Sequence, residues 1–300
     1  MSVAAAPQRP QQPLYIMVSP SHFTIRQSIN PLSVQSHSHV HRQKAIRDFE
    51  KLVRTVKRLG GNPYIVSPDI IDPDNKTPDI IYSANWGISL PMPTAPFILA
   101  RMLSAYRRHE SERVAGFLLS HLRTNLFTLD PPTIFEGTGL TVWSHKNTHL
   151  WIGYGVRTSY RDARALSSLI SEIYAVHALK APTIHLLHIK NPWYDLDLAF
   201  LAFPNGKLLY RPDAFTATSI RHIKHVFGTN AVEFNITNSP FALNAKIINN
   251  TILCGTITRD AIDQLTAISG LPVVSCPLPE IEKGGGSVRC CMLDYYISAD

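Results

Sequence analysis

The stretch KGGGSVRC, Lys283–Cys290, most strongly decides how the rest of this sequence is interpreted. Three consecutive glycines, Gly284–Gly286, form a loop shortly before Cys290, a context that Cys254 and Cys276 do not share. Cys254 and Cys276 lie in apolar, strand-like runs, where a cysteine usually behaves as a small buried hydrophobe. We interpret Cys291 as a buried neighbour and Cys290 as the single candidate for a reactive thiol.

Upstream of this loop, short apolar strands alternate with amphipathic helices. Glycine and proline punctuate the pattern without a long linker, which predicts one α/β domain of repeated units. Periodicity alone leaves a doubly wound sheet open, but no G-x-G-x-x-G follows the first strand, which argues against a dinucleotide site. We expect strands at residues 14–18, 64–66, 80–83, 150–152, 184–187, 198–202, 231–234, 247–253 and 273–276, and helices at 45–59, 115–122, 160–178, 217–226 and 259–268.

Composition narrows the class of protein further. A hydrophobic fraction of 45% and a charged fraction of 17% are typical of a globular domain. The net charge is +7, but the basic residues are scattered, so we predict no specific nucleic-acid binding. No apolar run is long enough for a membrane span. We predict a disordered leader at residues 1–13 and one domain at residues 14–300. The four cysteines form no C-x-x-C pair, so we expect a reducing compartment and predict a cytoplasmic location.

Three alternating histidines, His37, His39 and His41, could share one face of a strand. No cysteine or carboxylate cluster lies near them in the sequence, so we predict no metal site.

Seven segments, in order, give the sequence a family resemblance over about residues 14 to 293. The chain resembles the pentein superfamily of guanidine-modifying proteins, which includes arginine dihydrolases, dimethylarginine dimethylaminohydrolases and amidinotransferases. The resemblance implies five ββαβ-type units around a pseudo-fivefold axis, an α/β propeller with its active site in a central funnel. The segments that carry it are His22–Pro31, Pro78–Gly87, Tyr106–Glu110, Phe135–Gly139, Gly153–Thr158, Asn191–Asp197 and Lys283–Cys290.

The chemistry of that superfamily explains the residue types in these segments. A guanidinium carbon is stabilised by resonance, so its attack needs a thiolate, carboxylates that hold its nitrogens, and an acid for the departing amine. No cofactor is implied. By resemblance, Cys290 is the nucleophile, Asp197 and Asn85 hold the guanidinium, Glu136 orients the acid–base residue, and Asn30 and Arg107 contact the rest of an arginine-like substrate, Arg107 as a fork for its carboxylate.

Two positions depart from the family pattern. Asp195 stands where the catalytic histidine is expected, and Leu140 stands where an aspartate is expected. The first change removes the one group of that motif whose ordinary pKa lies near neutrality. If Glu136 and Asp195 are adjacent, one carboxyl should have a raised pKa and could act as the acid. A second hypothesis is that His37, His39 or His41 supplies the missing imidazole.

Two functions therefore stay open. The first is a hydrolase of C–N bonds in arginine or another guanidino compound, through a covalent intermediate on Cys290 and with impaired catalysis. Asn85 within SANWG most resembles the arginine dihydrolase branch. The second is a non-catalytic pentein, a pseudoenzyme that serves as a ligand-binding, assembly or structural protein. The resemblance also raises the expectation of a homo-oligomer.

Overall fold

The computed structural model describes residues 13–26, 30–33 and 39–298. The expected leader falls almost wholly outside these residues, and so does His37. The described chain has a mixed α/β fold, as predicted from the alternating pattern. Its strands are β1 (Leu14–Val18), β2 (Asn62–Val66), β3 (Gly87–Ser89), β4 (Phe97–Leu99), β5 (Leu126–Phe127), β6 (Thr141–Ser144), β7 (His149–Tyr154), β8 (Thr183–His188), β9 (Phe200–Ala202), β10 (Leu208–Tyr210), β11 (Ala231–Glu233), β12 (Lys246–Ile248), β13 (Thr251–Cys254), β14 (Val273–Ser275) and β15 (Leu293–Tyr295).

These strands form five separate three-stranded sheets rather than one closed barrel in the described part of the chain. Every sheet is built in the same way: its middle strand pairs antiparallel with one neighbour and parallel with the other. The first sheet joins the two ends of the chain, because β1 pairs antiparallel with β15, with Leu14 opposite Tyr295. The described chain therefore closes on itself.

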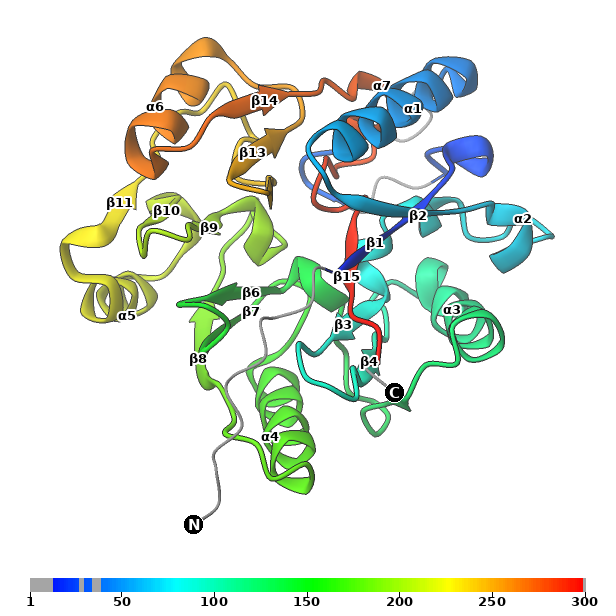
Figure 1. Ribbon diagram of the computed structural model, residues 1–300, viewed down its shortest axis with the longest axis horizontal. Helices are drawn as coiled ribbons and strands as arrows, with labels where there is room; N and C mark the ends of the chain where they lie inside the picture. Colours follow the sequence, from blue (N-terminus) through cyan, green and yellow to red (C-terminus); the bar gives the residue numbers. More distant parts are fainter. Residues whose placement is uncertain (1–12, 27–29, 34–38, 299–300) are drawn as a thin grey trace.

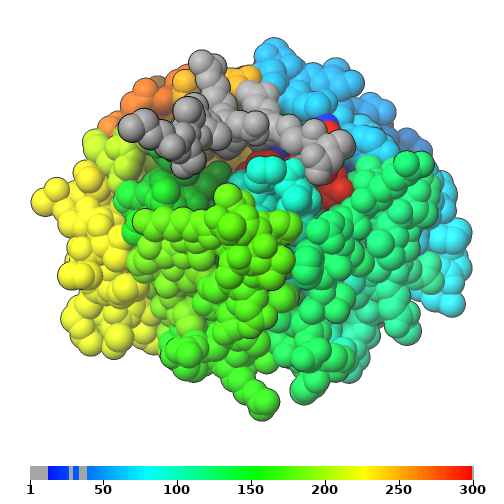
Figure 2. All heavy atoms as spheres, turned by 60° about the horizontal axis from the view of Figure 1, so that its bottom comes forward, coloured from blue at the N-terminus to red at the C-terminus, as the bar shows by residue number. Residues whose placement is uncertain are grey.

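A helix connects the middle strand of each sheet to its parallel partner, as a parallel crossover requires. The five long helices follow one another around the outside of the molecule (Figure 1). The space-filling view shows the same succession of segments around one face (Figure 2). The helices are α1 (Arg42–Arg58), α3 (Arg108–His121), α4 (Tyr160–Val176), α5 (Ala217–Phe227) and α6 (Arg259–Ser269), with short helices α2 (Pro68–Ile71) and α7 (Pro279–Glu282).

Helix α1 illustrates why these segments are helical. Ala45, Phe49, Leu52 and Val56 recur at spacings of three and four residues and are all buried. The other face of the helix carries basic side chains that remain in solvent. Of the described helices, none is long and apolar enough to cross a lipid bilayer.

Two strands predicted from the sequence are wrong. The strand expected at residues 247–253 is a hairpin of β12 and β13, with a turn at Asn249 and Asn250. Residues 80–83 are apolar and buried, but the backbone forms two successive 3-10 turns, η2 (Pro78–Ile81) and η3 (Ser83–Trp86), before β3 begins. The Ser83 hydroxyl donates to the carbonyl of Ile16, which fixes the turn against β1. A short apolar run predicts burial, and its length does not separate a strand from a buried turn.

Helix α3 begins seven residues before its predicted start at residue 115. Its first turns are mostly polar and face solvent, so the apolar period that marks a helix is missing there. Several two- to four-residue strands were also not predicted, among them β3, β4 and β6. They are too short for an alternating pattern to stand out.

Candidate active site

In four of the five sheets, the segment that enters the outer antiparallel strand carries predicted site residues. In the fifth sheet, the segment before β12 carries Asn244, which was not singled out from the sequence. Asn85 lies in η3 before β3, and Glu136 precedes the 3-10 turn η5 (Gly137–Gly139) before β6. Asp195 and Asp197 lie at and in η6 (Leu196–Leu198) before β9, and Cys290 lies shortly before β15. Because these positions correspond in the different sheets, residues more than two hundred apart in sequence come together.

Cys290 is almost fully buried, with 3% of its surface exposed. Its Sγ atom lies 3.2 Å from Asn244 Nδ2 and 3.9 Å from Asp197 Oδ2. The Asn244 side chain also accepts hydrogen bonds from the backbone N–H groups of Arg289 and Cys290, and so orients the loop. Burial, followed by the charges of Asp197 and Asp195, raises the pKa of the Cys290 thiol well above its usual value.

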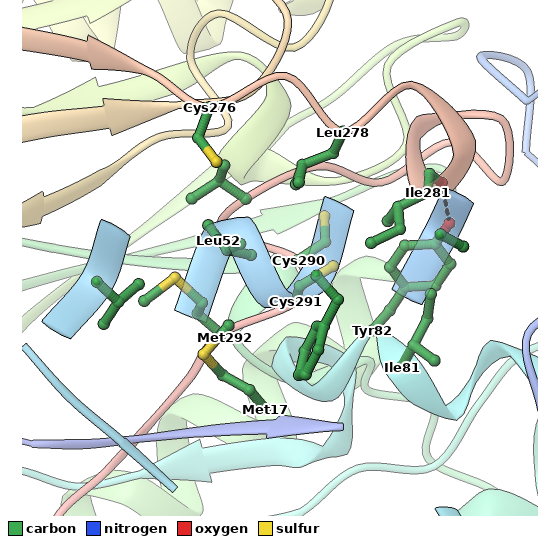
Figure 3. Packing of buried hydrophobic residues seen from close by; sticks show 14 of the residues in the cluster. Met17, Leu52, Ile81, Tyr82, Cys276, Leu278, Ile281, Cys290, Cys291 and Met292 are labelled. Atoms are coloured by element: carbon green, nitrogen blue, oxygen red, sulfur yellow. Dashed lines mark hydrogen bonds between the residues drawn. The ribbon is translucent and has the colours of Figure 1, made fainter. Parts of the chain in front are cut away.

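The glycines before Cys290 are required by close packing. A Cβ atom on Gly286 would lie 2.6 Å from the ring of Tyr82, and one on Gly284 would lie 2.2 Å from its hydroxyl oxygen. Tyr82 donates from that hydroxyl to the carbonyl of Ile281 and packs beside Cys290 and Cys291 (Figure 3). Only glycine lets the chain pass this close to the tyrosine.

Asp195 and Asp197 each keep one carboxylate oxygen without a hydrogen-bond partner, although both residues are fully buried. Burial raises the pKa of Asp197 to about 8, and the neighbouring charge of Asp195 adds to the rise. Burial also raises the pKa of Asp195 to about 6, with Arg157 opposing the rise and Glu136 adding to it. Unpaired carboxylate oxygens in a buried site can accept hydrogen bonds from an additional donor.

Arg157 lies at the centre of the site, and sequence reasoning assigned it no role. Its guanidinium lies 2.8 Å from Glu136 Oε2 and 2.9 Å from Asp195 Oδ2, and it also donates to the side chain of Asn30. It stacks over the ring of Tyr194, 4.4 Å from the ring centroid. The available signal was that Arg157 belongs to a segment carrying the family resemblance, and that clustered buried acids need a cation.

The two predicted asparagines are both part of this arrangement. Asn30 donates to the carbonyl of Gly284 at 3.0 Å, so it ties the loop of the nucleophile to Arg157. Asn85 donates to the backbone carbonyl of Glu136 at 3.1 Å. These hydrogen bonds fix the position of Glu136 and of the loop before Cys290 within the site.

Arg107 requires a correction. It was expected to offer a free fork for a substrate carboxylate, but both arms of that fork are taken by Glu110, at 2.8 and 2.7 Å. Arg107 is 2% exposed and Glu110 is fully buried, so the pair is internal. Its remaining nitrogen donates weakly to Asn85 at 3.3 Å. The geometry therefore assigns Arg107 to support of the site.

Leu140 also differs from expectation. It packs in an apolar cluster with Ile88, Phe135 and Leu150, so this position does not face the charged site. The replacement of an expected aspartate here removes no group from the thiol's surroundings. His39 and His41 are exposed, and their rings contact each other, so neither supplies an imidazole to the buried site.

The fold and this buried arrangement of a thiol, carboxylates and arginine define a protein of the pentein, guanidine-modifying class. The sequence model of the family described as "N,N dimethylarginine dimethylhydrolase, eukaryotic" matches residues 19–189, more than half of the chain. The chain belongs to this family.

Similar proteins agree with this assignment. The chain is 29% identical to the N(G),N(G)-dimethylarginine dimethylaminohydrolase of Mycobacterium tuberculosis, over 97% of this chain and 88% of the relative. It is 28% identical to the bifunctional arginine dihydrolase/ornithine cyclodeaminase ArgZ of Synechocystis, over 93% of this chain but 37% of that protein. The chain thus spans little more than a third of that relative. The product-bound N-terminal domain of ArgZ has a TM-score of 0.83 at 24% identity, over 96% of this chain and 98% of the domain, which is a likeness of fold.

Proposed function

We propose that this protein binds arginine or a related guanidino compound and attacks the guanidinium carbon with Cys290. The observation that supports this proposal is the meeting of Cys290 Sγ with Asp197 at 3.9 Å, beside the unpaired oxygens of Asp195 and Asp197. A guanidinium presents five N–H donors, which suits a buried site with unsatisfied carboxylate oxygens. Similarity to an arginine dihydrolase and to a dimethylarginine dimethylaminohydrolase favours hydrolysis over transfer.

In the proposed reaction, the positive charge of the bound guanidinium favours the ionised form of Asp197. The Cys290 thiol passes its proton to Asp197 Oδ2, which lies 3.9 Å away, as Sγ bonds to the guanidinium carbon. The bond from that carbon to one nitrogen then breaks, and protonated Asp195 gives its proton to the departing amine. Water gives one proton to Asp195 as its oxygen bonds to the resulting thiouronium carbon. The carbon–sulfur bond then breaks, and Asp197 returns its proton to the sulfur. The product keeps the oxygen of that water.

Catalysis in this scheme is impaired because Asp195, the proposed proton donor to the departing amine, is a weaker source of protons at neutral pH than the expected histidine. Burial raises the pKa of Asp195 to about 6, which is still below pH 7, so the ionised form predominates at neutral pH. The ion pair with Arg157 stabilises this ionised form. Slow release of the amine should therefore limit turnover.

A non-catalytic binding or structural role is the second candidate. The observation that favours it is that Arg157 already pairs with both Glu136 and Asp195, which gives these two carboxylates a cation without a substrate. In this alternative the site is a structural crosslink, and Cys290 is a buried hydrophobe.

Labelling with 2-chloroacetamidine, a small amidine electrophile, separates the two candidates. We expect one adduct per chain on Cys290 by mass spectrometry, slowed by excess arginine and absent in Cys290→Ala. Cys291→Ala is the matched control, because it removes the neighbouring buried thiol and leaves Cys290 beside Asp197, so labelling should persist. If the folded wild-type protein gives no adduct, and arginine leaves its melting temperature unchanged, the structural role replaces the catalytic one.

The five equally built sheets also support two proposals about the scaffold. We propose that they are related by a pseudo-fivefold axis, and that residues 14–300 form one domain around the site. The corresponding positions of the site residues before the outer strands are what this repetition would produce.

A further inference from the structure

A cavity lies outside the candidate active site. Its volume is about 420 Å³, within the range of sites that hold small organic ligands. It is enclosed by the end of β4, the first turns of α3 and the loop of residues 128–135 that follows β5. Nothing in the proposed reaction uses it.

Two arginines in this cavity have no acidic partner. Arg101 is half-buried, and its side chain forms neither an ion pair nor a hydrogen bond with any described residue. Arg108 donates only to the carbonyl of Leu103, at 3.4 Å. Elsewhere in the described chain, the buried Arg107 and Arg157 are paired with carboxylates, and the buried Arg211 donates to backbone carbonyls. An arginine held in a concave wall without a partner is suited to bind an anion.

The other residues that line the cavity restrict the charge and the chemical character of the anion. Glu112 is the one acidic residue of the wall, so two arginines and one glutamate leave a single net positive charge when His109 is neutral. The hydroxyl of Ser111 is buried without a hydrogen-bond partner and can donate. Leu129 and Phe135, among others, give part of the wall an apolar character.

We propose that this cavity binds a small organic monocarboxylate, whose carboxylate is held by Arg101 and Arg108 and whose apolar body packs against Leu129 and Phe135. A single negative charge matches the net charge of the wall, whereas a dianion would face Glu112 uncompensated. The cavity shares a wall with the candidate active site. Arg101 and Phe135 exchange backbone hydrogen bonds of 2.8 and 3.1 Å, and Glu136 follows Phe135 directly.

Calorimetric titration of the full chain with sodium phenylacetate tests this proposal. We expect saturable binding of one phenylacetate per chain. Phenylacetamide, which has the same shape without the charge, should bind at least about tenfold more weakly, because hydrogen bonds to a charged group are the stronger ones. Comparable binding of the two, no saturation, or tighter binding of inorganic phosphate would each overturn the proposal.

Variants locate the binding. Arg101→Gln and Arg108→Glu should each weaken phenylacetate binding by about tenfold or more. Arg108 is exposed in the first turn of α3, where an acidic residue suits a helix, so Arg108→Glu keeps the fold. Arg161→Gln, an exposed change on α4, should bind as the wild type does. Equal loss in Arg161→Gln, or loss in Cys290→Ala, would instead mean unspecific attraction or entry into the active site, and would refute the assignment.

Discussion

The guanidinium of Arg157 lies 2.9 Å from Asp195 Oδ2, in a site where both side chains are almost fully buried. This ion pair joins the residue that replaces the expected histidine to a cation from a different sheet. Burial raises the pKa of Asp195, while Arg157 acts in the opposite direction. The balance between them decides whether Asp195 can serve as an acid, and it motivates the first prediction.

Restoring an imidazole should restore turnover. In Asp195→His, the new group has an ordinary pKa near 6.5 and would lie close to Glu136. We expect hydrolysis of arginine, followed by ammonia release, to rise at least about tenfold, since general acid–base catalysis is typically worth about 10²–10⁴. Asp195→Asn, of similar size but without an acid, should show no rise. A folded Asp195→His protein that is still labelled at Cys290 yet gains no activity would contradict this explanation.

The change Leu140→Asp, although it restores the family pattern, should destabilise the protein. It would place a carboxylate among Ile88, Phe135 and Leu150. We expect a loss of about 3 kcal/mol or more in the free energy of unfolding by urea. Leu140→Met keeps the volume and should lose less than about 1.5 kcal/mol. Equal stability of the two variants would show that this side chain is not confined to the apolar cluster.

Removal of the central cation should be costly. Arg157→Gln leaves Glu136 and Asp195 buried without their partner, and breaking a buried ion pair from one side typically costs about 3–5 kcal/mol. Arg161→Gln, the same chemical change at an exposed position, should stay within about 0.5 kcal/mol of the wild type. Urea unfolding measures both. A loss in Arg157→Gln below about 1 kcal/mol would mean that solvent reaches the acids.

Asp197 predicts how stability depends on pH. Its pKa is about 8 in the folded protein and about 4 in an unfolded chain, so the folded state binds more protons between these values. Stability should therefore fall as pH rises from about 4 to about 8. Asp197→Asn, neutral at every pH, should show a smaller fall in melting temperature between pH 6 and pH 8. The exposed Asp260→Asn should keep the wild-type slope, and an equal slope in Asp197→Asn would argue against a raised pKa.

Much of the fold followed from local patterns. Amphipathic spacing identified all five long helices, because a helix with one apolar face repeats that face over many residues. The short strands and 3-10 turns were harder. Residues 80–83 read as a strand, although the chain turns there to carry Asn85 toward the site. Such turns are held by contacts such as Ser83 with Ile16, which lie far apart in the sequence.

The sequence by itself determined the family, the candidate thiol and the acids that lie near it, because these residue types occur in ordered motifs beside glycine loops. Tertiary structure alone decided how the charges are paired. It placed Arg157 between Glu136 and Asp195, and it joined Arg107 to Glu110. It also placed the side chain of Leu140 in an apolar cluster of the core. Pairing depends on the distance and burial of groups from different sheets, and neither is encoded in local spacing.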